Sequence, residues 1–312
     1  MSSPVTIITS VYSATDEFLI NLSKSVKKQR YSGKIRHIMI NDNIKRKIPE
    51  ILGVKVINHS KNIGLAKTLN EGFKLAKTDI IVSLMDDCVP ASNKWLSGLV
   101  SPLEDKKVAA TTSDVELPEK FWNGFSYFAR ALTEKEQRII VPGLDEKGCA
   151  YRKSAIKEFG YLNDKEFTNG GEDTDLTMKI ERSGKWHIVH TRARVFHYHY
   201  FSAKSRLKKE IQYAKLSGLV SRKYFFRLPW NFKLHVSARI LVALFFLYSL
   251  ISGNALFISA LLVLLLSNIR LPSQIKRLGL SIKTIGVVAL NILVYLLYVY
   301  NYIYALLFKP RV

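Results

Sequence analysis

Acidic residues are absent from the last third of this 312-residue chain. All 25 Asp and Glu residues lie at or before Glu210, whereas Lys and Arg continue to the C-terminus, and the net charge is +22. A site that needs carboxylates, for a metal ion or for proton transfer, is therefore excluded from residues 211–312. Long apolar runs fill this acid-free region, which indicates that the two parts of the chain face different solvents.

Cysteine is also scarce, since Cys88 and Cys149 are the only two in the chain. They lack the spacing of a metal site, and two cysteines do not suggest a disulfide framework. We therefore expect reduced thiols and a cytoplasmic catalytic part. The sequence contains neither G-x-x-x-x-G-K-[ST] nor G-x-G-x-x-G, so neither a P-loop nor a dinucleotide-binding fold is supported.

Short apolar runs of strand length alternate with helical patterns in the first 200 residues. Strand-like runs lie at residues 5–11, 35–40, 54–57, 78–84, 108–112 and 148–152, and helical spacing lies between several of them. This alternation predicts a doubly wound α/β domain with a mainly parallel sheet.

One of these apolar runs ends in two adjacent carboxylates, Asp86 and Asp87. Carboxylates at the carboxyl end of a buried strand lie where open α/β sheets bind ligands. Two neighbouring anions are tolerated where a divalent cation and a phosphate join them. The alternative is a solvated strand end, because Asp is common in turns, and these two residues alone leave both interpretations open.

Polar residues also follow two other strand-like runs. Asp42 ends the second run and would face the same crevice as Asp86 and Asp87; it predicts a hydrogen bond to a nucleobase, or else an Asx turn. Asn62 and Gly64 open a helical segment, where backbone N–H groups can approach a base or a phosphate closely. Ordinary capping of the helix by Asn62 is the alternative.

Clustered carboxylates follow Gly170-Gly171 at the start of another helical pattern. They are Glu172, Asp173 and Asp175. The functional interpretation is a general base on a mobile loop. The structural interpretation is an acidic first turn, which the helix dipole favours.

Two histidines, His197 and His199, end the last strand-like run. We expect their rings to point to opposite faces, so that only one imidazole reaches a given site. One of them could complete a metal sphere with Asp87. Histidines exposed on the surface are the alternative.

The region after residue 203 combines positive charge with apolar runs. Residues 204–227 hold eight Lys and Arg against one Glu, and 204–233 is predicted to be a basic amphipathic interfacial segment. The apolar segments at 234–251, 255–269 and 284–308 predict about three transmembrane helices, since about 20 residues cross the hydrocarbon core. The first two are expected to form a hairpin, with one long tilted helix or a re-entrant pair as the alternatives.

Basic residues in the loop between the second and third apolar segments indicate orientation. Arg270, Lys276, Arg277 and Lys283 place this loop in the cytoplasm by the positive-inside rule. We therefore expect a multi-pass membrane protein with its catalytic domain facing the cytoplasm, a short outer turn at 252–254 and an outward C-terminus. No nucleic-acid partner is expected, because the basic residues cluster beside apolar spans without a recognition motif.

Together, these motifs resemble a known family. The shared order is the strand ending in Asp42, the Asn62-x-Gly64 helix start, the strand ending in Asp86-Asp87, the run Gly171-Glu172-Asp173-Thr174-Asp175-Leu176, and the final histidines. In this order and spacing the chain is similar to inverting GT-A glycosyltransferases of family 2, including rhamnosyltransferase-like members with C-terminal membrane helices. The resemblance covers about residues 4–202. It implies a GT-A catalytic domain at 1–203 with a doubly wound mixed α/β sheet, followed by the interfacial segment and an α-helical membrane domain at 234–312.

The resemblance also implies a role for each site residue. Asp173 would be the catalytic base with Glu172 supporting it, and Asp87 and His197 would bind Mn²⁺ or Mg²⁺. His199 is the alternative contact to the metal or the diphosphate. The implied donor-binding residues are Thr9, Val11, Asp42, Asn62, Gly64 and Asp86.

The expected reaction moves a sugar from a nucleotide-diphosphate donor to a hydroxyl of a lipid-linked or membrane-proximal glycan. A hydroxyl acceptor has to lose a proton, which a carboxylate base can take, whereas a phosphate acceptor is already ionised. A polyprenyl-phosphate glycosyltransferase of the dolichyl-phosphate type is therefore the alternative enzyme. The alternative of another class is a non-catalytic membrane scaffold that binds nucleotide sugars, and the presence of both the metal and the base carboxylates argues against it.

Overall fold

The computed structural model describes residues 2–137, 139, 143–168 and 170–310. The chain divides into two compact units. Unit 1 comprises Met1–Trp122 and Glu136–His199, and unit 2 comprises Asn123–Lys135 and Tyr200–Val312. The sequence placed the end of the catalytic domain at residue 203, and it did not predict that Asn123–Lys135 groups with the C-terminal unit.

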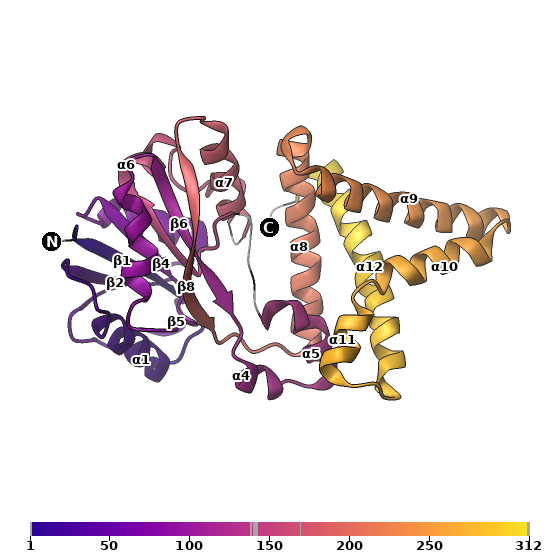
Figure 1. Ribbon diagram of the computed structural model, residues 1–312, viewed down its shortest axis with the longest axis horizontal. Coiled ribbons are helices and arrows are strands. Elements are labelled where there is room, and N and C mark those ends of the chain that lie inside the picture. Colours follow the sequence, from indigo (N-terminus) through magenta and orange to yellow (C-terminus); the bar gives the residue numbers. More distant parts are fainter. Residues whose placement is uncertain (1, 138, 140–142, 169, 311–312) are drawn as a thin grey trace. The chain divides into compact units, whose positions relative to one another are not determined.

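The elements follow the chain in the order drawn in Figure 1. The strands are β1 (Val5–Val11), β2 (Ile35–Asn41), β3 (Val54–Asn58), β4 (Ile80–Leu84), β5 (Cys88–Pro90), β6 (Val108–Glu116), β7 (Gly148–Arg152) and β8 (His187–His197). The helices are α1 (Asp16–Lys27), α2 (Leu65–Leu75), α3 (Trp95–Val100), α4 (Glu119–Asn123), α5 (Tyr127–Thr133), α6 (Lys153–Glu158), α7 (Glu172–Arg182), α8 (Ala203–Tyr224), α9 (Trp230–Ser252), α10 (Leu256–Ser267), α11 (Leu271–Leu278) and α12 (Lys283–Phe308).

Unit 1 is built on an eight-stranded mixed sheet in the order β3-β2-β1-β4-β7-β6-β8-β5. β1 runs parallel to β2 and β4, and β2 runs parallel to β3, as the strand–helix alternation predicts. β7 is antiparallel to β4 and β6, and the short β5 is antiparallel to β8. The predicted doubly wound mixed α/β fold is confirmed: β3, β2, β1 and β4 are parallel, and β6 also pairs in parallel with β8.

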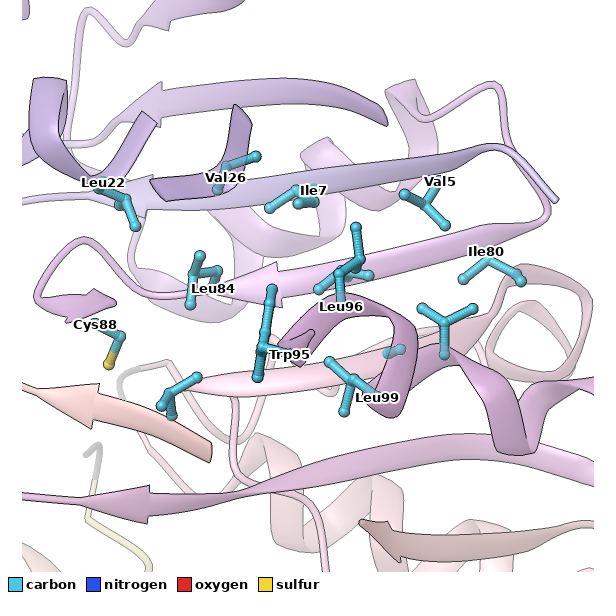
Figure 2. Close-up of a cluster of buried hydrophobic side chains, with 14 of the residues drawn as sticks. Val5, Ile7, Leu22, Val26, Ile80, Leu84, Cys88, Trp95, Leu96 and Leu99 are labelled. Atoms are coloured by element: carbon cyan, nitrogen blue, oxygen red, sulfur yellow. The ribbon is translucent and has the colours of Figure 1, made fainter. Parts of the chain in front are cut away.

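Both faces of this sheet are buried, which explains the continuous apolar runs of its strands. On one face, Ile7 packs in a cluster with Leu22 of α1 and Trp95 of α3 (Figure 2). On the other face, Ile8 packs with Phe73 of α2 and with residues of α6 and α7. Side chains alternate along β1, so the two layers of helices enclose the sheet and leave its strand ends for polar residues.

Unit 2 is helical. Among the described residues, α9 and α12 are long and apolar enough to cross a membrane, with mean hydropathies of 1.9 and 1.7. A third span is reached only if α10 and α11, which are bent by 50°, are counted as one. α9, α10 and α12 correspond to the three predicted apolar segments, while α11 was not predicted.

Candidate active site

The pairing of β5 with β8 builds the first part of the site. β5 begins directly after Asp87, and its register places Cys88 opposite His197. The pairing continues by one residue, because the Tyr198 N–H donates to the Asp87 carbonyl oxygen at 2.8 Å. This register brings the end of β8 against a carboxylate that lies 110 residues earlier in the chain.

Both histidines contact that carboxylate. His197 Nε2 lies 3.2 Å and His199 Nδ1 lies 2.9 Å from Asp87 Oδ2. The expectation that only one imidazole reaches the site is wrong, because an extended chain alternates sides at each residue and residues two apart share a side. Tyr198, between them, points the other way and packs edge-on against Phe18 and Phe121.

The surroundings of Asp87 keep it anionic. Burial by itself would raise the pKa of its carboxyl group, but hydrogen bonds from His197 and His199, together with their charge, hold that pKa well below its ordinary value. A carboxylate and two imidazoles can hold a divalent transition-metal ion, and the carboxylate is the ligand type among them that suits Mn²⁺. Among the described residues, ligand atoms of Asp87, Cys88 and His197 lie within 4.8 Å of one another.

Cys88 fits a metal less well than its neighbours. The side chain is fully buried, and burial, followed by the charge of Asp87, raises the pKa of its thiol well above the ordinary value. A protonated thiol is a poor ligand, so Asp87 and the two imidazoles are the better candidates. Cys88 and Cys149 are both free and buried.

Asp86 lies beside Asp87 in the sequence, but its carboxylate contacts the loop that follows β1. Its Oδ2 accepts hydrogen bonds from the backbone N–H groups of Tyr12, Ser13 and Ala14 at 2.8 to 3.0 Å. Burial and the adjacent Asp87 raise the pKa of this carboxyl group, while the three backbone donors lower it. Asp86 thus fixes the loop that follows β1, and its contact with a donor sugar stays a prediction.

The two predicted donor-binding residues on β1 are completely buried. The Thr9 hydroxyl is hydrogen-bonded to His37 Nε2 at 3.0 Å. The Val11 carbonyl oxygen accepts from the Asp42 N–H at 2.9 Å, so it ties β1 to the end of β2. These contacts belong to the sheet, and the roles of both residues in donor binding stay predictions.

Asp42 organises the loop before α2. Its Oδ1 accepts from the Ile63 N–H at 2.8 Å and its Oδ2 from the Gly64 N–H at 2.9 Å. His59 Nδ1 lies 2.9 Å from Oδ1, and Asn62 Nδ2 donates to the Asp42 carbonyl oxygen at 3.2 Å. Gly64 has a φ of 87°, which favours glycine. Asp42, Asn62 and Gly64 thus lie together, with Asn62 bonding to Asp42 rather than capping α2, and their role in donor binding stays a prediction.

A second group of carboxylates lies at the start of α7. Gly171 precedes the helix with a φ of 89°, and Asp173 Oδ1 accepts from the Thr174 N–H at 2.6 Å. Burial, followed by the charge of Asp145, raises the pKa of Asp173 to about 6. Burial, followed by the charge of Asp173, raises the pKa of Glu172 to about 8. The Glu172 Oε2 atom has no hydrogen-bond partner among the described residues.

The loop before β7 contributes three residues that the sequence did not predict. Lys147 Nζ lies 2.9 Å from Asp145 Oδ1, and Tyr151 donates a hydrogen bond to Glu146 Oε2 at 2.8 Å. Burial, followed by the charges of Asp173 and Glu172, raises the pKa of Glu146 well above its ordinary value. Nothing local in the sequence marks this loop, apart from its two adjacent acids, because its neighbours come from a helix more than 20 residues later.

The Asp145–Lys147 pair connects the two carboxylate groups. Asp145 affects the pKa of Asp173, and both members of the pair also affect the pKa of the Cys88 thiol next to Asp87. Charges inside a protein are screened less than charges in water. The Asp145–Lys147 pair thus acts electrostatically on both the candidate base and the thiol next to Asp87.

The comparisons with known proteins concern the family and the fold of the chain. Residues 6–160 match the family described as glycosyl transferase family 2, and no curated protein matches the chain. The mannosyltransferase PcManGT from Pyrobaculum calidifontis, solved in complex with GDP-Man and Mn²⁺, has a TM-score of 0.60 at 15% identity; the match covers 98% of this chain and 87% of that one. GalNAc-T7, solved with UDP, GalNAc and Mn²⁺, has a TM-score of 0.51 at 16% identity over 74% of this chain and 53% of that one. At these identities both structures support the fold alone.

Proposed function

Because this chain belongs to glycosyltransferase family 2 through its N-terminal GT-A domain, we propose that it is a membrane-bound, metal-dependent, inverting glycosyltransferase. It moves a sugar from a nucleotide-diphosphate donor to a hydroxyl of a lipid-linked or membrane-proximal glycan. The catalytic unit faces the cytoplasm, where the reduced state of Cys88 and Cys149 is maintained.

The observation that carries this proposal is the pair of carboxylate groups in unit 1. Asp87 is held as an anion by two imidazoles, whereas the pKa of Asp173 is raised to about 6. A metal ligand has to stay ionised, and a general base works best with a pKa close to the working pH. The two groups therefore meet the two separate needs of an inverting sugar transfer.

Each group has its own task in the reaction. Asp87 and the two imidazoles would hold a divalent cation, which would supply positive charge to the diphosphate leaving group. Asp173 takes the proton of the acceptor hydroxyl as the hydroxyl attacks the anomeric carbon. Glu172 is neutral near pH 7, since its pKa is about 8, and so it adds no second negative charge beside Asp173. A single displacement of this kind inverts the anomeric centre.

The apolar helices of unit 2 support an acceptor that lies in or near a membrane. α9 and α12 are apolar enough to cross a bilayer, and seven Lys and Arg residues of α8 suit an anionic surface. A membrane anchor, whether multi-pass or one-sided, keeps the catalytic unit close to lipid-linked substrates. A free hydroxyl is favoured over a phosphate as the acceptor because only the hydroxyl needs Asp173.

The test uses purified full-length protein in detergent. Release of nucleoside diphosphate is measured for a panel of nucleotide sugars with Mn²⁺ or Mg²⁺, first alone and then with membrane lipid extracts. We expect release with at least one donor, stimulation by the lipid extract, and loss of release with EDTA. Metal-dependent turnover with none of the donors would overturn the proposal.

A matched variant separates the two acceptor classes. Asp173→Asn should lose transfer, while Asp79→Asn, an exposed acid before the start of β4, serves as the control and should retain it. If Asp173→Asn keeps activity and the product is an acid-labile sugar phosphate, the acceptor is a polyprenyl phosphate and the assignment of the base is wrong.

A further inference from the structure

Unit 2 contains a long stretch without any charged side chain. Arg239 and Arg270 border it, and it covers most of α9 and all of α10. Gly253 and Ala255, both with positive φ, turn the chain between the two helices. Large apolar side chains beside this turn are exposed: the exposed fraction is 88% for Ile251 and 80% for Phe257. Exposure of this kind marks a surface that contacts lipid rather than water.

The uncharged parts of the two arms of this hairpin are short, although α9 as a whole has 23 residues. At about 1.5 Å per residue, the part of α9 from Arg239 to Ser252 extends about 20 Å. α10 has 12 residues, which corresponds to about 18 Å. The hydrocarbon core of a bilayer is about 30 Å thick. Neither uncharged arm reaches from one face to the other.

Charged residues begin just after the C-terminal end of α10, and contacts of α11 fix the chain there. α11 turns away by 50°, and it carries Lys276 and Arg277. Arg270, which precedes it, pairs with Glu134 at 3.0 Å, and Gln274 Nε2 donates to the Ala131 carbonyl oxygen at 3.0 Å. These contacts hold α11 against α5, so α11 cannot extend the apolar arm.

α12 is long enough to span a bilayer, but it has a charged partner along its length. α8 and α12 lie side by side in Figure 1. Any side chain at Gly218 would meet the Tyr302 carbonyl oxygen, and Arg222 Nη1 donates to the carbonyl oxygens of Leu306 and Leu307 at 3.2 and 3.0 Å. Residue numbers rise together in the two helices, so they run parallel.

This pairing bears directly on topology. α8 carries seven Lys and Arg residues, which are Lys204, Arg206, Lys208, Lys209, Lys215, Arg222 and Lys223. If α12 crossed the bilayer, α8 would accompany it and several of these charges would enter the hydrocarbon, which is strongly unfavourable. A pair lying along the membrane surface keeps the charges in water and the exposed stripe of α12, including Leu293, Leu296 and Tyr300, against lipid.

We propose that α9 and α10 form a re-entrant hairpin that enters a phospholipid bilayer and leaves it on the same side, while α8 and α12 lie along that surface. The C-terminus then lies on the side of the catalytic unit, in contrast to the outward C-terminus predicted from the sequence. Trp230 supports this depth at the base of α9, since it is 73% exposed and Lys233 lies over its ring at 5.6 Å. The inference rests on the membrane attachment in the proposed function but not on catalysis.

Cysteine labelling tests the side on which each end lies. Three full-length variants are compared in spheroplasts of an expression host: Asn254→Cys at the turn, Lys309→Cys near the C-terminus, and Leu52→Cys, which replaces an 87% exposed residue of unit 1 as the control. Cys88 and Cys149 are fully buried and give little background. With a membrane-impermeant maleimide, Lys309→Cys and Leu52→Cys should react only after permeabilisation. Reaction of Lys309→Cys or Asn254→Cys in intact spheroplasts would overturn the hairpin.

The depth of the turn gives a second measurement. The Asn254→Cys variant is labelled with a fluorophore and reconstituted in vesicles that contain lipids brominated at known depths. We expect the strongest quenching from bromines deep in the acyl chains and little quenching by aqueous iodide on either side. A hairpin that crosses would place the label among head groups, where iodide quenches it. Neither readout needs activity, whereas absence of the protein from the membrane fraction would contradict the attachment itself.

Discussion

Two groups of carboxylates in unit 1 have pKa values that are shifted in opposite directions. Burial raises the pKa in both groups, but Asp87 faces two histidines, whose hydrogen bonds and charge bring its pKa well below the ordinary value. Asp173 and Glu172 face other acids instead, and their pKa values rise to about 6 and about 8. Similar burial therefore yields a permanent anion in one place and a proton acceptor in the other, and the partners decide which.

The largest expected effects are losses of sugar transfer, which should have different causes in the Asp173 and the Asp87 variants. Asp173→Asn should lower sugar transfer by about 10²- to 10⁴-fold, the usual contribution of a general base, while the affinity for donor and metal is retained. Asp87→Asn should also abolish transfer, but through lost metal affinity. Single-turnover assays and titration of the free protein with Mn²⁺ distinguish the two, with Asp79→Asn as the control. Equal loss of Mn²⁺ affinity in both variants would contradict the division of roles.

His197 and His199 should contribute differently to the affinity for Mn²⁺. His197 is buried and pairs with Asp87 beside the end of β8, whereas the His199 side chain is 42% exposed. We expect His197→Ala to weaken Mn²⁺ binding by roughly 10- to 100-fold and His199→Ala to weaken it less. Isothermal titration measures both values, and His190→Ala, a histidine of β8 beside Asp114, is the matched control. A larger effect at His199 would reverse the order proposed here.

Stability should respond to pH in opposite directions at the two groups. The pKa of Asp173 rises from 3.8 to about 6 on folding, so the folded state binds this proton more tightly and the free energy of unfolding falls as pH rises between these values. The pKa of Glu172 extends the window to about 8. In metal-free buffer, Asp173→Asn should therefore be more stable than the wild type at pH 8, by on the order of 1 kcal/mol, with no difference below about pH 4.

Asp87→Asn should show the reverse. The pKa of Asp87 is depressed in the folded state, so the stability it contributes is present above its unfolded value of 3.8 and is lost as pH falls below that value. The variant should be less stable than the wild type at pH 7. Urea titrations at a series of pH values measure both differences. If the two variants shifted stability with the same sign at pH 8, the opposition between the two groups would not hold.

The smallest effect is expected at Glu146. Burial raises the pKa of this carboxyl group well above its ordinary value, which favours its neutral form, and Glu146 Oε2 accepts a hydrogen bond from Tyr151. Glu146→Gln keeps a neutral acceptor and should change the rate of transfer by less than about threefold, whereas Glu146→Leu leaves the buried Tyr151 hydroxyl without this acceptor and should destabilise the protein by about 1–3 kcal/mol. Thermal unfolding and pH–rate profiles check both. A shift of the profile in Glu146→Gln would show that Glu146 is charged.

Most of the fold could be predicted from the sequence. The strands at 5–11 and 148–152 coincide with β1 and β7, because an apolar run of strand length between turn residues is a local signal. The antiparallel insertion of β7 between β4 and β6 was not predicted, since pairing order depends on contacts between distant segments. The same holds for Asn123–Lys135, whose neighbours in unit 2 come from the C-terminal helices.

The sequence by itself determined which residue types are present for the chemistry and where the apolar segments lie. It marked Asp87 after a strand, Asp173 after two glycines and the acid-free region after Glu210, because these signals depend only on neighbouring residues. Tertiary structure decided which side chains meet. The register of β5 against β8 brought both His197 and His199 to Asp87, and the loop before β7 placed Asp145 near Asp173. Electrostatic shifts depend on distance in space rather than along the chain, so only the folded arrangement could lower the pKa of one carboxylate and raise that of the other.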